Sequence, residues 1–167
     1  VALAEGLGAC AVGLNCSLGP RQMLPAVHRF VSCASVPVVV KPNAGLPEEV
    51  GGNTIYNVDE EQFAADMREI LALGVSVVGG CCGTTPAYIA KLKGVCAQFE
   101  FAPVKDKGLT QISSYTHAVT FGGAPVIIGE RINPTGKKRL KQALKDGDMS
   151  CILGEAVSQA EAGALVL

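Results

Sequence analysis

The sequence predicts an α/β fold built on a parallel sheet, and two observations lead to this prediction. Short Val-rich apolar runs alternate three times with segments whose apolar residues recur at helical spacing. The runs are continuous rather than interrupted by polar residues, which is typical of strands covered on both faces. Each run leads into a loop that carries cysteine or asparagine beside glycine and proline. We therefore expect functional side chains at the carboxyl ends of the strands.

The composition describes a globular protein and excludes several classes of function. The chain has 167 residues, of which 49 % are hydrophobic and 17 % charged. A net charge of −1, with no basic patch interleaved with aromatic residues, argues against nucleic-acid binding. No run approaches the roughly 20 apolar residues of a membrane span. The seven cysteines lie in apolar α/β segments, which disfavours the alternative of a disulfide framework and predicts a reducing, cytoplasmic location.

The first half of the chain reads as three strand and helix pairs. Asp59 is the expected N-cap of the second helix, with Gln62 three residues later. Thr85 and Pro86 suit the start of the third helix, and Gly94 suits its end. We expect a loop around Pro47, Gly51, Gly52 and Asn53. The predicted strands are 9–16, 36–40 and 75–78, and the predicted helices are 21–34, 59–74 and 86–93.

The periodicity breaks after residue 97 and resumes near residue 124. Residues 98–123 contain a proline, a charged turn and a short Thr/Ser/Tyr stretch, and we interpret them as a linker. A new unit then starts with a strand over 124–128, its loop over 129–136 and a helix over 137–145. Asp148 is the expected cap of a further helix that ends at Gly163. Because the chain starts in the tail of a helix and stops inside an apparent strand, we expect a fragment of a longer protein.

Three cysteines occupy equivalent places after two of these strands. Cys16 follows the first strand, and the adjacent Cys81 and Cys82 follow the third, between glycines that allow the backbone to leave strand geometry. Three thiolates around one zinc ion would leave a fourth position open, which is the arrangement of a catalytic site. The alternative is three inert buried thiols, but adjacent cysteines between glycines fill a core poorly.

Two sets of motifs resemble known enzyme families. The stretches 13–16, 41–45 (Lys-Pro-Asn-Ala-Gly) and 79–86 resemble the carboxyl-terminal part of the homocysteine S-methyltransferase barrel. The stretch 128–136 resembles the start of the pterin-binding barrel that receives methyltetrahydrofolate. In this order the two resemble the cobalamin-dependent methionine synthases. The resemblance implies parts of two consecutive (βα)8 TIM barrels, neither complete in this chain, over 1–97 and 124–167 with the linker 98–123 between them.

The resemblance also implies a chemistry. Zinc held by Cys16, Cys81 and Cys82 would take the sulfur of homocysteine as a fourth ligand and supply it as a thiolate. The methyl group would come from methyltetrahydrofolate through cobalamin, which a module of the parent protein outside this chain would bind. Asn43 is a candidate substrate-binding residue beside the zinc. Its alternative role is to stabilise the Pro-Asn-Ala-Gly turn.

In the second unit Glu130 and Asn133 are candidate cofactor-binding residues. A carboxylate such as that of Glu130 can accept two N–H bonds from a pterin ring, and the Asn133 amide could add another. The structural alternative pairs Glu130 with Arg131 or Lys137 and leaves Asn133 to shape a turn before Pro134.

Two other functions remain open from the sequence. One is a homocysteine methyltransferase that uses another donor, such as a sulfonium or a quaternary amine, although a single-barrel enzyme has no use for the 129–136 motif. The other is a non-catalytic zinc-binding module in which the barrel parts serve only as structure.

Overall fold

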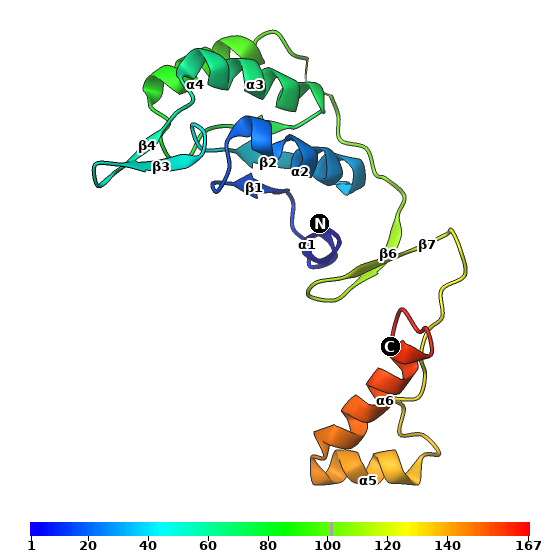
Figure 1. The fold of residues 1–167 in the computed structure, drawn as a ribbon. Coiled ribbons are helices and arrows are strands. Elements are labelled where there is room, and N and C mark those ends of the chain that lie inside the picture. The colour runs from blue at the N-terminus through cyan, green and yellow to red at the C-terminus, as the bar shows by residue number, and fades with distance from the viewer. Residues whose placement is uncertain (101) are drawn as a thin grey trace. The chain divides into compact units, whose positions relative to one another are not determined.

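The computed structural model describes residues 1–100 and 102–167, which form two compact units, Val1–Gly108 and Leu109–Leu167 (Figure 1). The first unit is a mixed α/β structure. Its parallel sheet has the strand order β1-β2-β5, with Val12 beside Val38 and Val39 beside Val77. This agrees with the predicted parallel sheet. The elements of the sheet and its helices are α1 (Ala2–Gly6), β1 (Val12–Asn15), α2 (Pro20–Cys33), β2 (Val38–Lys41), α3 (Glu60–Ala72), β5 (Val77–Val78) and α4 (Pro86–Cys96).

The core of this unit lies between the sheet and the helices. Val40 of β2 and Val27 of α2 are fully buried, and α3 contributes Phe63, Met67 and Ile70. The spacing of these three residues places them on one face of α3, as the periodicity predicted. The Asp59 carboxylate accepts the Gln62 backbone N–H at 2.9 Å, so the predicted cap of this helix is confirmed. The packed helices hold the strands in parallel and bring the loops at their carboxyl ends together.

Some local predictions for the first unit were wrong. Gly94 does not end α4, which continues to Cys96 because glycine costs a helix interior only about 1 kcal/mol. Thr85 occupies the N-cap position of α4, but its side chain makes no capping hydrogen bond. The segment expected as a loop is a hairpin of β3 (Pro47–Val50) and β4 (Asn53–Tyr56), whose turn uses positive φ at Gly51 and Gly52.

The second unit contains an antiparallel hairpin and two helices, namely β6 (Thr110–Ser113), β7 (Ala118–Phe121), α5 (Lys138–Asp146) and α6 (Met149–Glu161). The hairpin lies in the stretch 98–123, which the sequence predicted as a linker. The strand predicted over 124–128 is reduced to one parallel bridge between Ile128 and Val166. The helix predictions hold: Gly147 ends α5 in the left-handed conformation and the Asp148 carboxylate caps α6.

Among the described residues no helix is both long enough and apolar enough to cross a membrane. All seven cysteines are free.

Candidate metal centre

Cys16 is placed at the carboxyl end of β1 by the neighbouring strand. Its backbone N–H donates to the Lys41 carbonyl at 3.0 Å, which continues the pairing of β1 with β2 by one residue. Cys16 and Ser17 both have a φ of +64°, a left-handed conformation that few residues other than glycine adopt. Such strain persists where the surrounding structure imposes it, and it is concentrated at functional sites. The strained turn directs the chain away from the strand toward Pro20, the first residue of α2.

Cys81 and Cys82 follow β5 through Gly79 and Gly80. The chain turns at Cys82 and Gly83, where Gly83 has a φ of +80°. The Cys81 N–H donates to the Pro42 carbonyl at 2.8 Å, and the Thr84 hydroxyl donates to the Cys81 carbonyl at 2.6 Å. The glycines therefore allow two consecutive thiols to lie on the same side of the backbone, which a regular strand would prevent.

The three thiols form one cluster. The Cys16 Sγ lies 3.6 Å from the Cys82 Sγ, which lies 3.8 Å from the Cys81 Sγ, and all three sulfurs are within 4.8 Å of one another. Zn–S bonds of about 2.3 Å in a tetrahedral arrangement place sulfurs about 3.8 Å apart. The spacing and the soft donor set therefore fit zinc. Cys82 is exposed while Cys16 and Cys81 are half-buried, so the cluster is accessible from solvent on the Cys82 side.

The pKa values of Cys16 and Cys82 shift in opposite directions. The Ser17 backbone N–H contributes most to lowering the pKa of Cys16, and hydrogen bonds from Cys82, Cys81 and Asn43 add to it. The Cys16 and Cys81 thiols in turn raise the pKa of Cys82. Like charges at this spacing repel, so the first thiolate to form opposes the next. A cation among the sulfurs would remove that penalty.

Asn43 lies buried between the two cysteine loops, with 2 % of its surface exposed. Its Oδ1 accepts the Cys82 N–H at 3.2 Å, and its backbone N–H donates to the Leu18 carbonyl at 2.9 Å. The next residue, Ala44, donates its N–H to the Cys82 carbonyl at 2.9 Å. The amide oxygen that the sequence assigns to zinc or substrate is thus engaged with the backbone of a cysteine loop.

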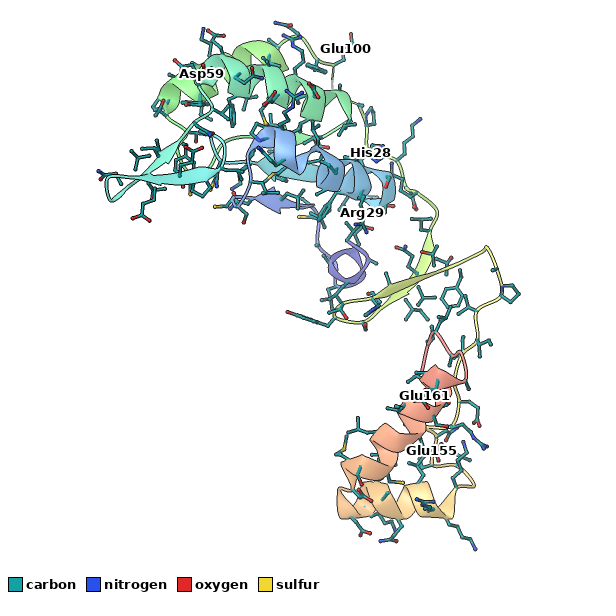
Figure 2. The ribbon with its side chains drawn as sticks, viewed as in Figure 1. His28, Arg29, Asp59, Glu100, Glu155 and Glu161 are labelled. Carbon is teal, nitrogen blue, oxygen red and sulfur yellow. The ribbon has the colours of Figure 1, made fainter. Side chains whose placement is uncertain are left out.

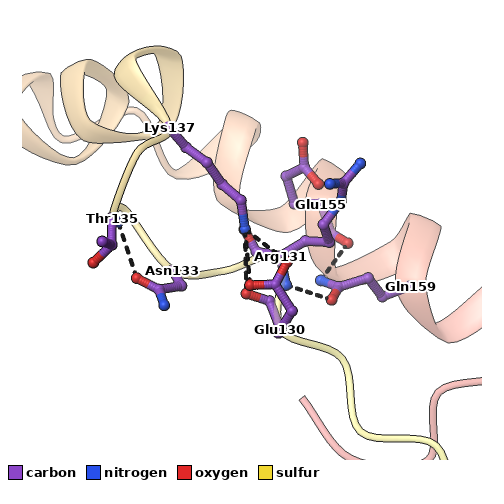
Figure 3. Close-up of polar contacts among 7 residues, drawn as sticks. All are labelled: Glu130, Arg131, Asn133, Thr135, Lys137, Glu155 and Gln159. Atoms are coloured by element: carbon purple, nitrogen blue, oxygen red, sulfur yellow. Dashed lines mark hydrogen bonds and ion pairs between the residues drawn. The ribbon is translucent and has the colours of Figure 1, made fainter.

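The candidate pterin residues lie in the loop between the Ile128 bridge and α5 (Figure 3). Both carboxylate oxygens of Glu130 accept from the Lys137 ammonium, at 3.1 and 3.2 Å. The Asn133 Oδ1 accepts the Thr135 N–H at 2.9 Å. The Arg131 N–H donates to the Oε1 of buried Gln159 on α6 at 2.8 Å. Glu130 and Asn133 therefore hold their own loop, and among the residues described here no cluster like that of the cysteines forms around them.

The sequence did not single out Tyr56 at the end of β4 or the left-handed turn at Cys16 and Ser17. The ring of Tyr56 packs against Gly83, and the one sign of this contact in the sequence is that residue 83 is a glycine. The strained backbone at Cys16 could not be predicted, because cysteine is not a residue type that favours positive φ. The two histidines, His28 on α2 (Figure 2) and His117, are exposed.

Comparison with known proteins identifies relatives over the whole chain. A family model described as homocysteine S-methyltransferase matches residues 1–96. The methionine synthase of Mycobacterium leprae is 34 % identical over 100 % of this chain, and that of Mycobacterium tuberculosis is 34 % identical over 98 % of it. The chain spans 14 % of the length of each of these two relatives.

Among solved structures, the chain is similar to the homocysteine methyltransferase MmuM from Escherichia coli in its metallated form. The match has 32 % sequence identity and a TM-score of 0.43, and it covers 56 % of this chain and 27 % of that one.

Proposed function

The chain belongs to the homocysteine S-methyltransferase family, and we propose that it supplies the zinc-binding part of a cobalamin-dependent methionine synthase. The single observation that carries this proposal is the cluster of Cys16, Cys81 and Cys82, whose sulfurs lie within 4.8 Å of one another. The similarity to two methionine synthases continues beyond residue 96 to the second unit, which favours this function over a methyltransferase of one barrel.

In the proposed reaction homocysteine accepts a methyl group and becomes methionine. Zinc, when bound to the three thiolates, would lower the pKa of a fourth thiol ligand and so supply a sulfur nucleophile at neutral pH. The chain's own residues fix the geometry. Hydrogen bonds to the Pro42 carbonyl, the Asn43 side chain and the Ala44 N–H hold the Cys81–Cys82 turn. The Lys41 carbonyl accepts the Cys16 N–H and so holds Cys16.

The accessible side of the cluster is where we place the homocysteine sulfur. Its thiol proton passes to solvent, its sulfur forms the new bond to the methyl carbon, and the electron pair of the broken bond stays with the donor. Asn43 bonds to the Cys82 N–H, and we propose that its amide would also contact the zinc or the amino acid.

For the remaining parts we propose domains over 1–97, 98–123 and 124–167, with the outer two as parts of consecutive (βα)8 barrels. Glu130 and Asn133 would contact the pterin of methyltetrahydrofolate, and a separate module of the parent protein would bind cobalamin. The free cysteines fit a reducing location, for which we propose the cytoplasm.

The metal part of the proposal is tested by the zinc content of the reduced chain. We expect close to one zinc per chain in the wild type, and its loss in Cys16→Ala and Cys82→Ala. Cys10→Ala is the matched control, because Cys10 is an exposed cysteine outside the cluster. A folded wild type without zinc, or zinc kept by both cluster variants, would contradict the metal site.

The donor is tested in the parent protein. Methionine formation is measured from homocysteine with either methylcobalamin or a methylsulfonium as the methyl donor. We expect turnover with methylcobalamin. Turnover with the sulfonium alone would favour the rival methyltransferase, and zinc binding without turnover by either donor would favour a structural zinc module.

A further inference from the structure

The loop between β2 and the β3–β4 hairpin is buried, although it belongs to no helix or strand. Its four buried residues are Pro42, Asn43, Ala44 and Gly45. Connecting segments normally run over the surface, because their backbone N–H and C=O groups need hydrogen-bond partners. The 42–45 loop must therefore find its partners inside the protein, and it finds them in the turns that carry the cysteines.

The 42–45 loop bonds to both cysteine turns. On one side the Cys81 N–H donates to the Pro42 carbonyl at 2.8 Å. On the other side the Asn43 N–H donates to the carbonyl of Leu18, in the turn that begins at the single cysteine. A loop that carries no thiol is thus the element that the two thiol-bearing turns share.

A contact between two glycines also joins the Cys16 turn, residues 16–19, to this loop. A Cβ atom on Gly19 would lie 2.9 Å from the Cα of Gly45. Real Cβ atoms do not approach backbone atoms so closely, and the backbone of a buried loop cannot swing aside as the end of a flexible side chain can. Gly19 has a φ of −77° and a ψ of 169°, values that any residue adopts. The close contact, and not the backbone conformation, therefore requires glycine at position 19.

The Cys16 turn is strained between its two points of attachment. The Cys16 N–H donates to the Lys41 carbonyl at 3.0 Å at the start of the turn, and Gly19 contacts the 42–45 loop at its end. Cys16 and Ser17 between them both have a φ of +64°. Residues other than glycine hold this conformation only where the surrounding structure imposes it. The attachments that impose it here come from the protein's own backbone.

We propose that the 42–45 loop is the template of the metal centre and that Gly19 is a positioning residue, which holds the Cys16 turn on this template. The two cysteine turns are then in place before a metal binds. This inference rests on the proposed zinc site. A ligand set that folding has already ordered binds more tightly, because metal binding does not have to order it.

The first test adds one methyl group at the contact. Gly19→Ala places a Cβ atom against the 42–45 loop. Gly129→Ala is the matched control in the second unit, where the added Cβ would lie 2.5 Å from the Gln159 Oε1. Zinc affinity is measured by competition with a chromophoric chelator, and after replacement of zinc by Co(II) the thiolate-to-cobalt charge-transfer band reports the sulfur ligands. We expect Gly19→Ala to weaken zinc binding about tenfold and to reduce the band, and Gly129→Ala to leave both unchanged.

The second test needs no metal. Ser17→Gly replaces a residue that is strained at positive φ by one that adopts positive φ freely. If the metal-free protein already holds the Cys16 turn on its template, this change relieves strain, and the Tm of the metal-free protein should rise. If the turn is not held without metal, glycine only adds conformational freedom to the unfolded chain, and the Tm should stay the same or fall.

The outcomes separate the template from the zinc site. An unchanged or lower Tm in Ser17→Gly would overturn the inference, and so would a wild-type zinc affinity and cobalt spectrum in a folded Gly19→Ala. If circular dichroism shows that Gly19→Ala does not fold, the Tm of Ser17→Gly decides. A wild type that binds neither zinc nor cobalt would overturn the proposed zinc site and the inference together.

Discussion

The cysteine loops of the first unit and the Glu130 loop of the second unit both follow an apolar segment, yet they use their polar groups differently. In the first unit backbone groups of adjacent loops bond to one another, as between Cys81 and Pro42 and between Ala44 and Cys82. The thiols are then free to converge on one point. In the second unit the side chains of Glu130 and Asn133 themselves hold the loop. Neighbouring parallel strands thus supply a scaffold that a single strand bridge does not.

The same contrast appears in the cores. In the first unit strands and helices share a buried cluster that includes Val40, Phe63 and Met67. In the second unit the buried apolar residues are Leu140 and Ala143, both on α5, among the residues that the structure describes. On α6, Leu153 and Val157 are more than half exposed. Loop geometry in the first unit is therefore supported by packing, and in the second by local hydrogen bonds.

Removal of the largest buried side chain gives the largest expected effect. Phe63 is fully buried and contacts Tyr88, so Phe63→Ala should cost about 3–5 kcal/mol in the free energy of unfolding. The chain should also lose zinc, because α3 supports the sheet that carries the cysteines. Urea unfolding followed by circular dichroism, together with zinc content, checks both. The matched control is Phe121→Ala, because Phe121 of β7 is only half-buried. An equal loss of unfolding free energy in the two variants would remove the contrast between the units.

Asn43 is the next most sensitive position. Asn43→Ala leaves the Cys82 N–H without its acceptor, at a cost of about 1–3 kcal/mol. Because this bond orients a cysteine loop, zinc affinity should fall about 10-fold or more, measured by chelator competition. Asn57→Ala is the control, since Asn57 is exposed and bonds to Glu48 on the hairpin. Unchanged metal and homocysteine affinity in Asn43→Ala would contradict the role of Asn43 at the site.

The sequence predicted the parallel sheet from patterns within single segments, and it predicted the convergence of the cysteines because the carboxyl ends of parallel strands meet at one edge. Continuous Val runs show strands buried on both faces, and the glycines around Cys81 and Cys82 show where the backbone can turn. Asp59 and Asp148 were recognisable as caps because a cap acts on residues two or three positions away. The helix caps and the strand pattern require no knowledge of which distant residue lies next to which.

The features that the sequence did not predict depend on pairs of distant residues. The hairpin of β3 and β4 contains glutamates and a proline and lacks the alternation of a half-buried strand. The contact of Tyr56 with Gly83 and the hydrogen bond that the Cys82 N–H donates to Asn43 follow only after the strands are paired. Ile and Val residues predicted the strand over 124–128, but among the described residues its pairing is limited to one bridge, between Ile128 and Val166.

The ion pair in the second unit should contribute less than either change in the first. Lys137→Met removes a partly exposed partner of Glu130 and should cost less than about 1 kcal/mol. If Glu130 is a pterin contact, this variant retains binding of methyltetrahydrofolate by calorimetry, whereas Glu130→Gln loses it. Equal binding by the two variants and the wild type would leave Glu130 with a role in loop structure alone.

The smallest expected effect is a pH dependence at the cap of α6. The Ser150 hydroxyl, followed by the Cys151 N–H, lowers the pKa of Asp148. A carboxyl group whose pKa is lower in the folded state stabilises it at pH values above its unfolded pKa of about 3.9, and this contribution is lost as the pH falls through the folded pKa. Helix signal at 222 nm should therefore decrease on acidification below about pH 4.

Asp148→Asn separates this cap from other acid-sensitive groups. The amide oxygen can still accept the Ser150 and Cys151 N–H groups, so α6 should start at the same residue, but the side chain no longer titrates. The difference in helix signal between wild type and variant should then vanish at low pH and grow as the pH rises. A difference that stays constant across the titration would mean that the charge of Asp148 does not stabilise α6. In that case the stability of the second unit would depend more on packing than on this local hydrogen-bonded cap.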